Sequence, residues 1–382
     1  MPTRYMRASS SVSLSCTSIT AASMPLYLCA DCGGSKTSVV ICDEHGTVLG
    51  RAFGGPSNFA YLSVEAFTSA VSLTISDALK TCITPPSVDP VSLPPIPGLI
   101  EAAWFGVSGV DSDSALSTIT KVLSSLLALP VGPKLLVGND TQLLAAPLRI
   151  HPELSSVVTV VAGTGSIAVS FESVNGELKE LGRAGGWGWI LGDAGGGFHV
   201  GQEAVRQVLR EGDKASVTAS PLFHSPFITS ILNAFSVTEV PEILSALYVA
   251  DPHPSSARVD GPPHTQIPRE KRLSSLAPLV FKAAFDDSDP LALNILRTAA
   301  EAIASEIALL LGERNDVSTK VVKAQSSLIS FGGSLAGVPA YRQFILDALA
   351  SWGHTFAAVE FVDDAATVGA KGLATSFKTA IP

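Results

Sequence analysis

The fold is decided by the stretch LYLCADCGGSKTSVVIC, residues 26–42. It contains two apolar runs, Leu26 to Ala30 and Thr37 to Cys42, which are separated by a glycine turn. A third apolar run, Thr47 to Phe53, follows after a second turn. Three short apolar runs joined by turns are typical of a β-meander. Apolar residues then recur every three or four positions between residues 61 and 80, which predicts a helix with one buried face.

The same order of elements recurs later in the chain. At residues 157–171 the sequence VVTVVAGTGSIAVSF again joins two apolar runs through a glycine turn. Leu178 to Leu181 is the third run, and a helical pattern begins near Phe198. Three strands followed by a helix therefore occur twice. This repeat predicts an α/β chain of two lobes, whose glycine turns face each other across a cleft.

The order of elements divides the chain into three parts. Residues 1–23 are rich in Ser and Thr and lack acids, and we expect a disordered tail there, although a transit peptide has a similar composition. The first lobe is expected over residues 24–150 and the second over residues 151–382. A segment dense in Pro, His and Ser near residues 251–268 is expected to be an insertion in the second lobe.

The two glycine turns suit a polyphosphate. Glycine lets backbone N–H groups approach an anion closely, and Ser or Thr hydroxyls add donors. We therefore interpret the pair of turns as a phosphate clamp, although each turn alone is more typical of a tight hairpin. Neither has the spacing of a Walker A loop. The predicted nucleotide contacts are Gly33, Gly34, Ser35 and Lys36 in the first turn and Gly163, Thr164 and Gly165 in the second.

Two aspartates stand at the ends of predicted strands. Asp31 directly precedes the first turn, where a carboxylate can hold Mg²⁺ beside phosphates. Asp140 follows the strand Lys134 to Val137 and begins a helix. A carboxylate there can accept the proton of a hydroxyl that attacks phosphorus, so we interpret Asp140 as a general base. An aspartate can also cap its own turn or a helix, and the residues alone leave both roles open.

The most unusual stretch is GGWGWILGDAGGG, residues 185–197. It holds seven glycines, two tryptophans and one acid. The face of Trp187 together with the carboxylate of Asp193 would suit a carbohydrate, because a sugar offers both an apolar ring face and hydroxyls. The alternative is a glycine-rich loop whose tryptophans lie in the core. Asn58, which follows the third strand, is a further candidate for binding sugar hydroxyls, or an ordinary turn residue.

Composition excludes several classes of protein. The formal net charge of −9 argues against a nucleic-acid partner. No apolar run approaches the roughly 18 residues of a membrane helix. The five cysteines are odd in number and lie early in the chain, so we expect a reducing, cytoplasmic location rather than a disulfide scaffold. Cys29 and Cys32 are expected in the core, because structural zinc needs four ligands and no second pair exists.

Together these motifs resemble the eukaryotic N-acetylglucosamine kinases, which are BadF/BadG/BcrA/BcrD-type ATPases of the sugar kinase, heat-shock protein and actin superfamily. The resemblance covers nearly the whole chain from Leu26 and is strongest at residues 31–37, 163–166 and 186–193. It implies two actin-like (ribonuclease H-like) lobes, each a mixed five-stranded sheet with flanking helices.

The resemblance also implies an activity and its residues. Asp140 would be the catalytic base for phosphorylation of the 6-hydroxyl of N-acetyl-D-glucosamine, with ATP and Mg²⁺. Gly333 and Ser334 would form the adenosine-side turn, while Ser35 and Thr164 would contact the nucleotide. The implied sugar contacts are Asn58, Asp140, Ser166, Gly186, Trp187, Gly188 and Asp193. The sequence departs at Ser35, where threonine is usual, but the hydroxyl is kept and binding is expected to survive.

Three alternatives remain beside this interpretation. One is a related kinase for glucosamine or another hexose. Another is an ATPase that activates a radical dehydratase and uses cysteines to hold an iron–sulfur cluster. The absence of any cysteine after Cys82 counts against this alternative. The third is a non-catalytic amino-sugar sensor, which would be expected to lose the base, whereas Asp140 is present. The expected partners are an amino sugar and ATP, with neither nucleic acid nor membrane, and the resemblance leaves room for a homodimer.

Overall fold

The structure is a computed structural model that describes most of the chain. The described residues are 24–34, 36–83, 85–110, 112–174, 177–219, 225–252, 261–312 and 320–379. The predicted tail 1–23, the predicted nucleotide contact Ser35 and residues 253–260 of the predicted insertion lie outside these ranges. Within the described ranges, no helix has the length and apolar character that crossing a membrane requires.

The first sheet is built from the predicted meander. Strands β1, β2 and β3 are antiparallel neighbours, and β4 and β5 extend the sheet parallel to β1, in the order β3-β2-β1-β4-β5. The strands are β1 (Leu26–Cys32), β2 (Thr37–Cys42), β3 (Val48–Gly54), β4 (Ile100–Val107) and β5 (Leu135–Gly138). Strands β1 and β2 are buried along their length apart from Asp31, as expected of central strands covered on both faces.

The second sheet repeats this topology. Its strands are β6 (Ser156–Ala162), β7 (Ser166–Val174), β8 (Glu177–Gly185), β9 (Ser327–Gly332) and β10 (Ala358–Phe361). The order β8-β7-β6-β9-β10 has the same mixture of antiparallel and parallel neighbours as the first sheet. The prediction of two lobes, each with a mixed five-stranded sheet, is therefore confirmed.

Helices cover both faces of the first sheet. Helices α1 (Val64–Leu79) and α2 (Asp113–Leu127) pack on one face, and α10 (Ala365–Thr379) packs on the other. Strand β1 alternates between these layers, since Leu28 belongs to the core beneath α1 and α2 while Cys29 belongs to the core beneath α10. Cys29, with Cys32, is a buried free thiol, as predicted.

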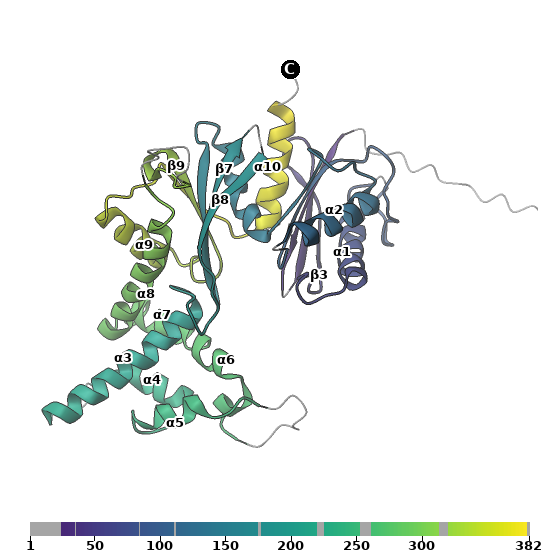
Figure 1. Cartoon of the computed structure of the whole chain (residues 1–382). Helices are drawn as coiled ribbons and strands as arrows, with labels where there is room; N and C mark the ends of the chain where they lie inside the picture. Colours follow the sequence, from purple (N-terminus) through teal and green to yellow (C-terminus); the bar gives the residue numbers. More distant parts are fainter. Residues whose placement is uncertain are drawn as a thin grey trace, which may run out of the picture.

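The chain crosses between the two lobes twice. The 3₁₀ segment η1 (Asp140–Ile150) follows β5 and contacts both β1 of the first sheet and β6 of the second. After β10 the chain returns, and α10 stands between the two sheets in Figure 1, against β1, β2 and η1. The lobe boundary at residue 150 stays a prediction. Helix α10 lies within residues 151–382, which were predicted to form the second lobe, but it packs on the sheet of the first lobe.

The remaining helices follow β8 and belong to the second lobe. In Figure 1, α3 to α7 form a group that projects away from the second sheet. The described helices between β8 and β10 are α3 (Gly197–Thr218), α4 (Pro226–Ala234), α5 (Glu242–Tyr248), α6 (Arg269–Ser274), α7 (Ala277–Phe285), α8 (Pro290–Ala308) and α9 (Pro339–Ser351), with the 3₁₀ turns η2 (Pro263–Gln266) and η3 (Ala324–Ser326). Helices α6 and α7 are separate, because Pro278 lacks an N–H and is tolerated only in a first turn, where it stands in α7.

Candidate active site

The predicted base lies at the carboxyl edge of the first sheet. Strands β1, β4 and β5 run parallel, so the residues that follow them meet at one edge. Ser108 follows β4, and its hydroxyl donates a hydrogen bond to Asp140 Oδ2 at the end of β5. A side chain on Gly106 would lie 3.1 Å from the Asp140 Cα, so glycine at this position of β4 allows η1 to approach the strand.

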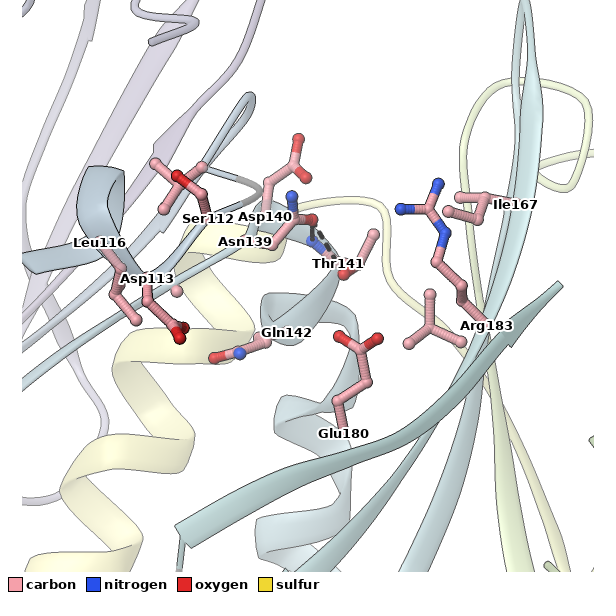
Figure 2. A pocket seen from close by; sticks show the side chains of 13 residues that line it. Ser112, Asp113, Leu116, Asn139, Asp140, Thr141, Gln142, Ile167, Glu180 and Arg183 are labelled. Atoms are coloured by element: carbon pink, nitrogen blue, oxygen red, sulfur yellow. Dashed lines mark hydrogen bonds between the residues drawn. The ribbon is translucent and has the colours of Figure 1, made fainter. Parts of the chain in front are cut away.

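The helix cap after β5 is Asn139 rather than Asp140. The Asn139 side-chain oxygen accepts hydrogen bonds from the backbone N–H of Thr141 at 3.1 Å and from its hydroxyl at 3.0 Å. Asp140 is therefore the first residue of η1, and its carboxylate points into a cavity, as Figure 2 shows. The sequence left two roles open for Asp140, general base and helix cap, and the structure gives the cap to Asn139.

Asp31 lies near Asp140 and shares its electrostatic environment. Burial, followed by the charge of Asp140, raises the pKa of Asp31 to about 6, against a smaller opposing effect of Lys36. When both are ionised, the carboxylates of Asp31 and Asp140 repel each other, and a bound cation would relieve that repulsion. Carboxylate oxygens are also the ligands that Mg²⁺ prefers. The pair fits Mg²⁺, although the described residues contain no cluster of three acidic, His or Cys side chains that would hold a metal without help from phosphate or water.

Asn58 lies beside the first glycine turn. The turn is closed by Gly33, whose N–H donates to Lys36 O at 3.0 Å and whose carbonyl accepts from Ser57 N–H at 3.0 Å. The Asn58 amide nitrogen lies 3.8 Å from where a side chain on Gly34 would begin. The Lys36 ammonium is placed elsewhere, 5.4 Å from the ring centroid of Phe53 on β3, so in this structure it is engaged in a cation–π contact.

The second glycine turn lies beside the turn that follows β9. A side chain on Gly163 would begin 3.8 Å from Ser334 N. Gly333 has a φ of 93°, and a side chain there would begin 2.6 Å from the carbonyl oxygen of Ala162. The carbonyls of Gly163 and Thr164 accept hydrogen bonds from the first N–H groups of α3. Five predicted nucleotide contacts (Gly163, Thr164, Gly165, Gly333 and Ser334) therefore stand at one edge of the second sheet.

Asp193 and Ser166 hold each other. Asp193 Oδ1 accepts from the Ser166 N–H at 3.4 Å, and the Ser166 hydroxyl donates to the Ala194 carbonyl at 2.7 Å. Burial raises the pKa of Asp193, although backbone hydrogen bonds from Ser166 and Gly188 oppose the rise. Both residues were predicted to contact the sugar, and the structure shows them bound to each other.

A cavity of about 580 Å³ separates the two lobes beside Asp140. The first lobe lines it with the residues after β5 and the start of α2, and the second lobe lines it with β7 and β8. Figure 2 shows the Arg183 guanidinium on β8 opposite the Asp140 carboxylate, with Glu180 below it. The Arg183 guanidinium also lies 3.2 Å from where a side chain on Gly186 would begin, which links the cavity to the glycine-rich loop.

Arg183 and Glu180 were not predicted from the sequence, because a β-bulge in β8 changes the face on which they lie. The predicted strand ended at Leu181, whereas β8 continues to Gly185. Ser170 pairs with Gly182 and Phe171 with Glu180, so Leu181 is the extra residue of a β-bulge. The bulge turns positions 180 and 183 to the same face. Strict alternation would put them on opposite faces, so only the length of the strand could have been inferred from sequence.

Trp187 lies outside this cavity. Its side chain is exposed, at 60% relative exposure, and it lines a second cavity of about 450 Å³ with Glu306 and Lys320. Arg183 lines both cavities and is the residue that connects them. The predicted sugar contacts are thus divided in this structure, with Asp140 in the first cavity and Trp187 at the second.

Comparison with known proteins identifies the family. The profile of the BadF/BadG/BcrA/BcrD ATPase family matches residues 30–372. The N-acetyl-D-glucosamine kinase of Dictyostelium discoideum is 27% identical over 286 residues, which is 74% of this chain and 77% of that protein. The N-acetylmuramic acid/N-acetylglucosamine kinase of Clostridium acetobutylicum is 31% identical over 186 residues, which is 48% of this chain and 53% of that protein.

Solved structures agree with the fold. A Porphyromonas gingivalis protein proposed to be an N-acetylglucosamine kinase superposes with a TM-score of 0.59 at 18% identity, over 92% of this chain and 99% of that one. A Chromobacterium violaceum protein with the same proposed activity gives 0.54 at 20% identity, over 92% and 100%. These likenesses concern the fold, and they confirm the predicted actin-like lobes. Because the family match spans nearly all of the described residues, the chain belongs to the BadF/BadG/BcrA/BcrD ATPase family.

Proposed function

We propose that this chain transfers the γ-phosphoryl group of ATP to the 6-hydroxyl of N-acetyl-D-glucosamine, giving N-acetylglucosamine 6-phosphate and ADP. The observation that carries the proposal is the place of Asp140. Its carboxylate points into the cavity between two lobes whose glycine turns suit phosphates. A sugar hydroxyl in this cavity would lie within reach of a base, as phosphoryl transfer to an alcohol requires.

That the chain is an ATP-dependent sugar kinase follows from its family and from its two kinase relatives. The choice of sugar and of hydroxyl is our proposal. Both relatives are named for N-acetylglucosamine, which supports that sugar over glucosamine or glucose. A cytoplasmic location and a homodimer remain predictions.

In the proposed reaction each lobe supplies part of the machinery. Asp140 accepts the proton of the attacking hydroxyl, and Ser108 holds its carboxylate in a fixed direction. Asp31 would hold Mg²⁺, which when bound neutralises charge on the phosphates. The nucleotide would bind at Gly33, Gly34, Ser35 and Lys36 in the first lobe and at Gly163, Thr164, Gly165, Gly333 and Ser334 in the second. The sugar would bind at Asn58, Ser166, Gly186, Trp187, Gly188 and Asp193.

A second candidate substrate is an amino sugar that carries a carboxylate. Arg183 faces Asp140 across the cavity, and within the described residues no acidic side chain lies at ion-pair distance from it. A guanidinium in this position suits a carboxylate through two parallel hydrogen bonds. N-acetylmuramic acid differs from N-acetylglucosamine by a lactyl ether that bears such a group, and one relative is named for both sugars.

A coupled assay of ADP release tests these proposals. The panel is N-acetylglucosamine, glucosamine, N-acetylmannosamine, glucose and N-acetylmuramic acid, with the product's phosphate position determined by NMR. We expect the highest kcat/KM with N-acetylglucosamine and phosphate on O6. Arg183→Met should lower kcat/KM for the muramic sugar at least tenfold and leave N-acetylglucosamine within threefold. No turnover with any sugar would reject the kinase proposal in favour of a sensor.

A further inference from the structure

The glycine-rich loop is joined to the second glycine turn by direct backbone contact. The four hydrogen bonds between them run from Ser166 N to Asp193 Oδ1, from Ser166 Oγ to Ala194 O, from Gly197 N to Gly163 O and from Phe198 N to Thr164 O. A side chain on Gly196 would begin only 2.7 Å from the carbonyl carbon of Gly165, so the two backbones touch. A shift of residues 193–198 would therefore also move the turn at residues 163–166.

Gly195, at the centre of that segment, is held at both of its backbone polar groups. Its N–H donates to His199 Nδ1 at 3.1 Å, and its carbonyl accepts from the Tyr341 hydroxyl at 2.8 Å. Its φ of 76° is a conformation that glycine adopts readily, and a side chain there would begin 2.6 Å from Ile303 Cβ. Side chains from two helices, α3 and α9, thus fix the two peptide groups on either side of the Gly195 Cα.

Tyr341 also connects the two nucleotide turns of the second lobe. It is fully buried near the start of α9, the helix that follows the turn at Gly333 and Ser334. Its hydroxyl reaches Gly195, which lies 146 positions earlier in the chain and adjoins the turn at residues 163–166. The phosphate-side turn and the adenosine-side turn are therefore joined through one tyrosine.

His199 is in the protonation state that this arrangement needs. Burial, and then the charge of Arg206, lower the pKa of His199, so at neutral pH its Nδ1 carries the lone pair that accepts from Gly195. Its Nε2 then carries the proton and faces Glu203 Oε1 at 3.8 Å.

We propose that His199 and Tyr341 are positioning residues for the nucleotide. By fixing Gly195 they set the turn at residues 163–166 relative to Gly333 and Ser334, so that both turns can bind one ATP. This inference rests on the proposed function, since it takes these turns as the ATP site. Neither side chain is proposed to touch ATP or the sugar.

The test uses variants that keep or remove single hydrogen bonds. Tyr341→Phe removes the donor to the Gly195 carbonyl. His199→Asn keeps an acceptor at the δ1 position, whereas His199→Gln moves it to the ε position. We expect Tyr341→Phe and His199→Gln to raise the KM for ATP five- to twentyfold and to leave the KM for the sugar within twofold. His199→Asn should stay within threefold of wild type for both. Tyr248→Phe, at an exposed tyrosine of α5, is the matched control.

A direct binding measurement separates this inference from the proposed reaction. Calorimetric titration of ATP into the full chain without sugar gives a Kd that does not depend on turnover. If the wild-type chain binds ATP but phosphorylates no sugar, the proposed substrate is wrong, and the positioning role is still read from the Kd of each variant. A fraction of a variant that is irreversibly misfolded lowers the number of binding sites but leaves the Kd unchanged, and a thermal melt of each variant excludes reversible unfolding at the temperature of the titration, which would raise the apparent Kd. The inference is overturned if Tyr341→Phe binds ATP as tightly as wild type, or if His199→Gln matches His199→Asn.

Discussion

The hydroxyl of Ser108 donates a hydrogen bond to Asp140 Oδ2 and so joins the ends of β4 and β5. The two residues lie 32 positions apart, and the parallel pairing of their strands brings them together. A general base must be aimed at the proton that it removes, and a hydrogen bond to one carboxylate oxygen fixes the direction of the other. The pair therefore makes separate predictions for the base and for the residue that orients it.

Asp140→Asn should abolish most of the activity without abolishing binding. General-base catalysis contributes about 10²- to 10⁴-fold, and we expect kcat to fall within that range. ATP and sugar affinities, measured by calorimetry, should stay within threefold. Asp113→Asn is the control, because Asp113 lines the same cavity from α2 and has no proposed role in proton transfer. An Asp140→Asn enzyme that retains more than a tenth of wild-type kcat would rule out the proposed base.

Ser108→Ala should weaken the base more gently and change its pH response. A hydrogen bond to a charged group contributes about 1.5–3 kcal/mol, so a loss in kcat of roughly 10- to 100-fold is expected. Because the lost bond favoured the ionised carboxylate, the acid limb of the kcat/KM profile should move to higher pH. Ser108→Thr, which keeps a hydroxyl, should restore the wild-type profile. An unshifted acid limb in Ser108→Ala would mean that the bond does not act on the base.

Asp31→Asn should stabilise the metal-free protein while impairing catalysis. Burial and Asp140 raise the pKa of Asp31 to about 6, from about 3.9 in the unfolded chain. Between these values the unfolded chain loses the proton that the folded chain keeps, so stability falls as pH rises from about 4 to 6. The substitution removes this loss and should raise the free energy of unfolding by about 1–3 kcal/mol at pH 7.

Urea unfolding with a chelator present measures the stability effect of Asp31→Asn. The variant and wild type should have the same stability at pH 4 and diverge by pH 7, and kcat with ATP should require more Mg²⁺. Equal stability at both pH values would show that the carboxylate is not destabilised by its surroundings.

Local patterns predicted the sheets, whereas long-range packing limited the rest. The apolar runs before and after Gly33 and Gly163 predicted both meanders, because a strand buried on both faces is apolar along its length. Chain order could not show that α10 returns to the first sheet, since its burial depends on distant residues. Nor could sequence decide between Asn139 and Asp140 as the helix cap, because both residue types favour that position. Glu180 and Arg183 were missed because a bulge reset the alternation.

Trp187 should report sugar binding by fluorescence. Its ring is exposed in this structure, so a sugar that covers it would shift its emission to shorter wavelength. Trp187→Phe should remove this shift, while Trp189→Phe should keep it. Trp187→Ala should raise the KM for N-acetylglucosamine about fivefold, because stacking with an aromatic ring is worth on the order of 1 kcal/mol. A shift that survives in Trp187→Phe would place the sugar away from this loop.

His151 links the end of η1 to β10, and this contact makes the stability of the fold depend on pH. It follows η1, and its Nε2 lies 3.1 Å from Glu360 on β10 while its Nδ1 lies 3.2 Å from Glu153. Burial opposes the charged form, but the hydrogen bonds with Glu360 and Glu153 outweigh it and raise the pKa of His151. A raised pKa means that the imidazolium stabilises the fold at low pH and that this contribution is lost as pH rises through the folded-state pKa.

His151→Gln should therefore lower the free energy of unfolding at pH 5.5 by about 0.5 kcal/mol, a modest value because the charges lie near solvent. At pH 8.5, where the wild-type imidazole is neutral, the difference from wild type should vanish. Urea unfolding at the two pH values decides the question. An equal loss at both in His151→Gln would mean that packing, rather than the ion pairs with Glu360 and Glu153, accounts for the contribution of His151.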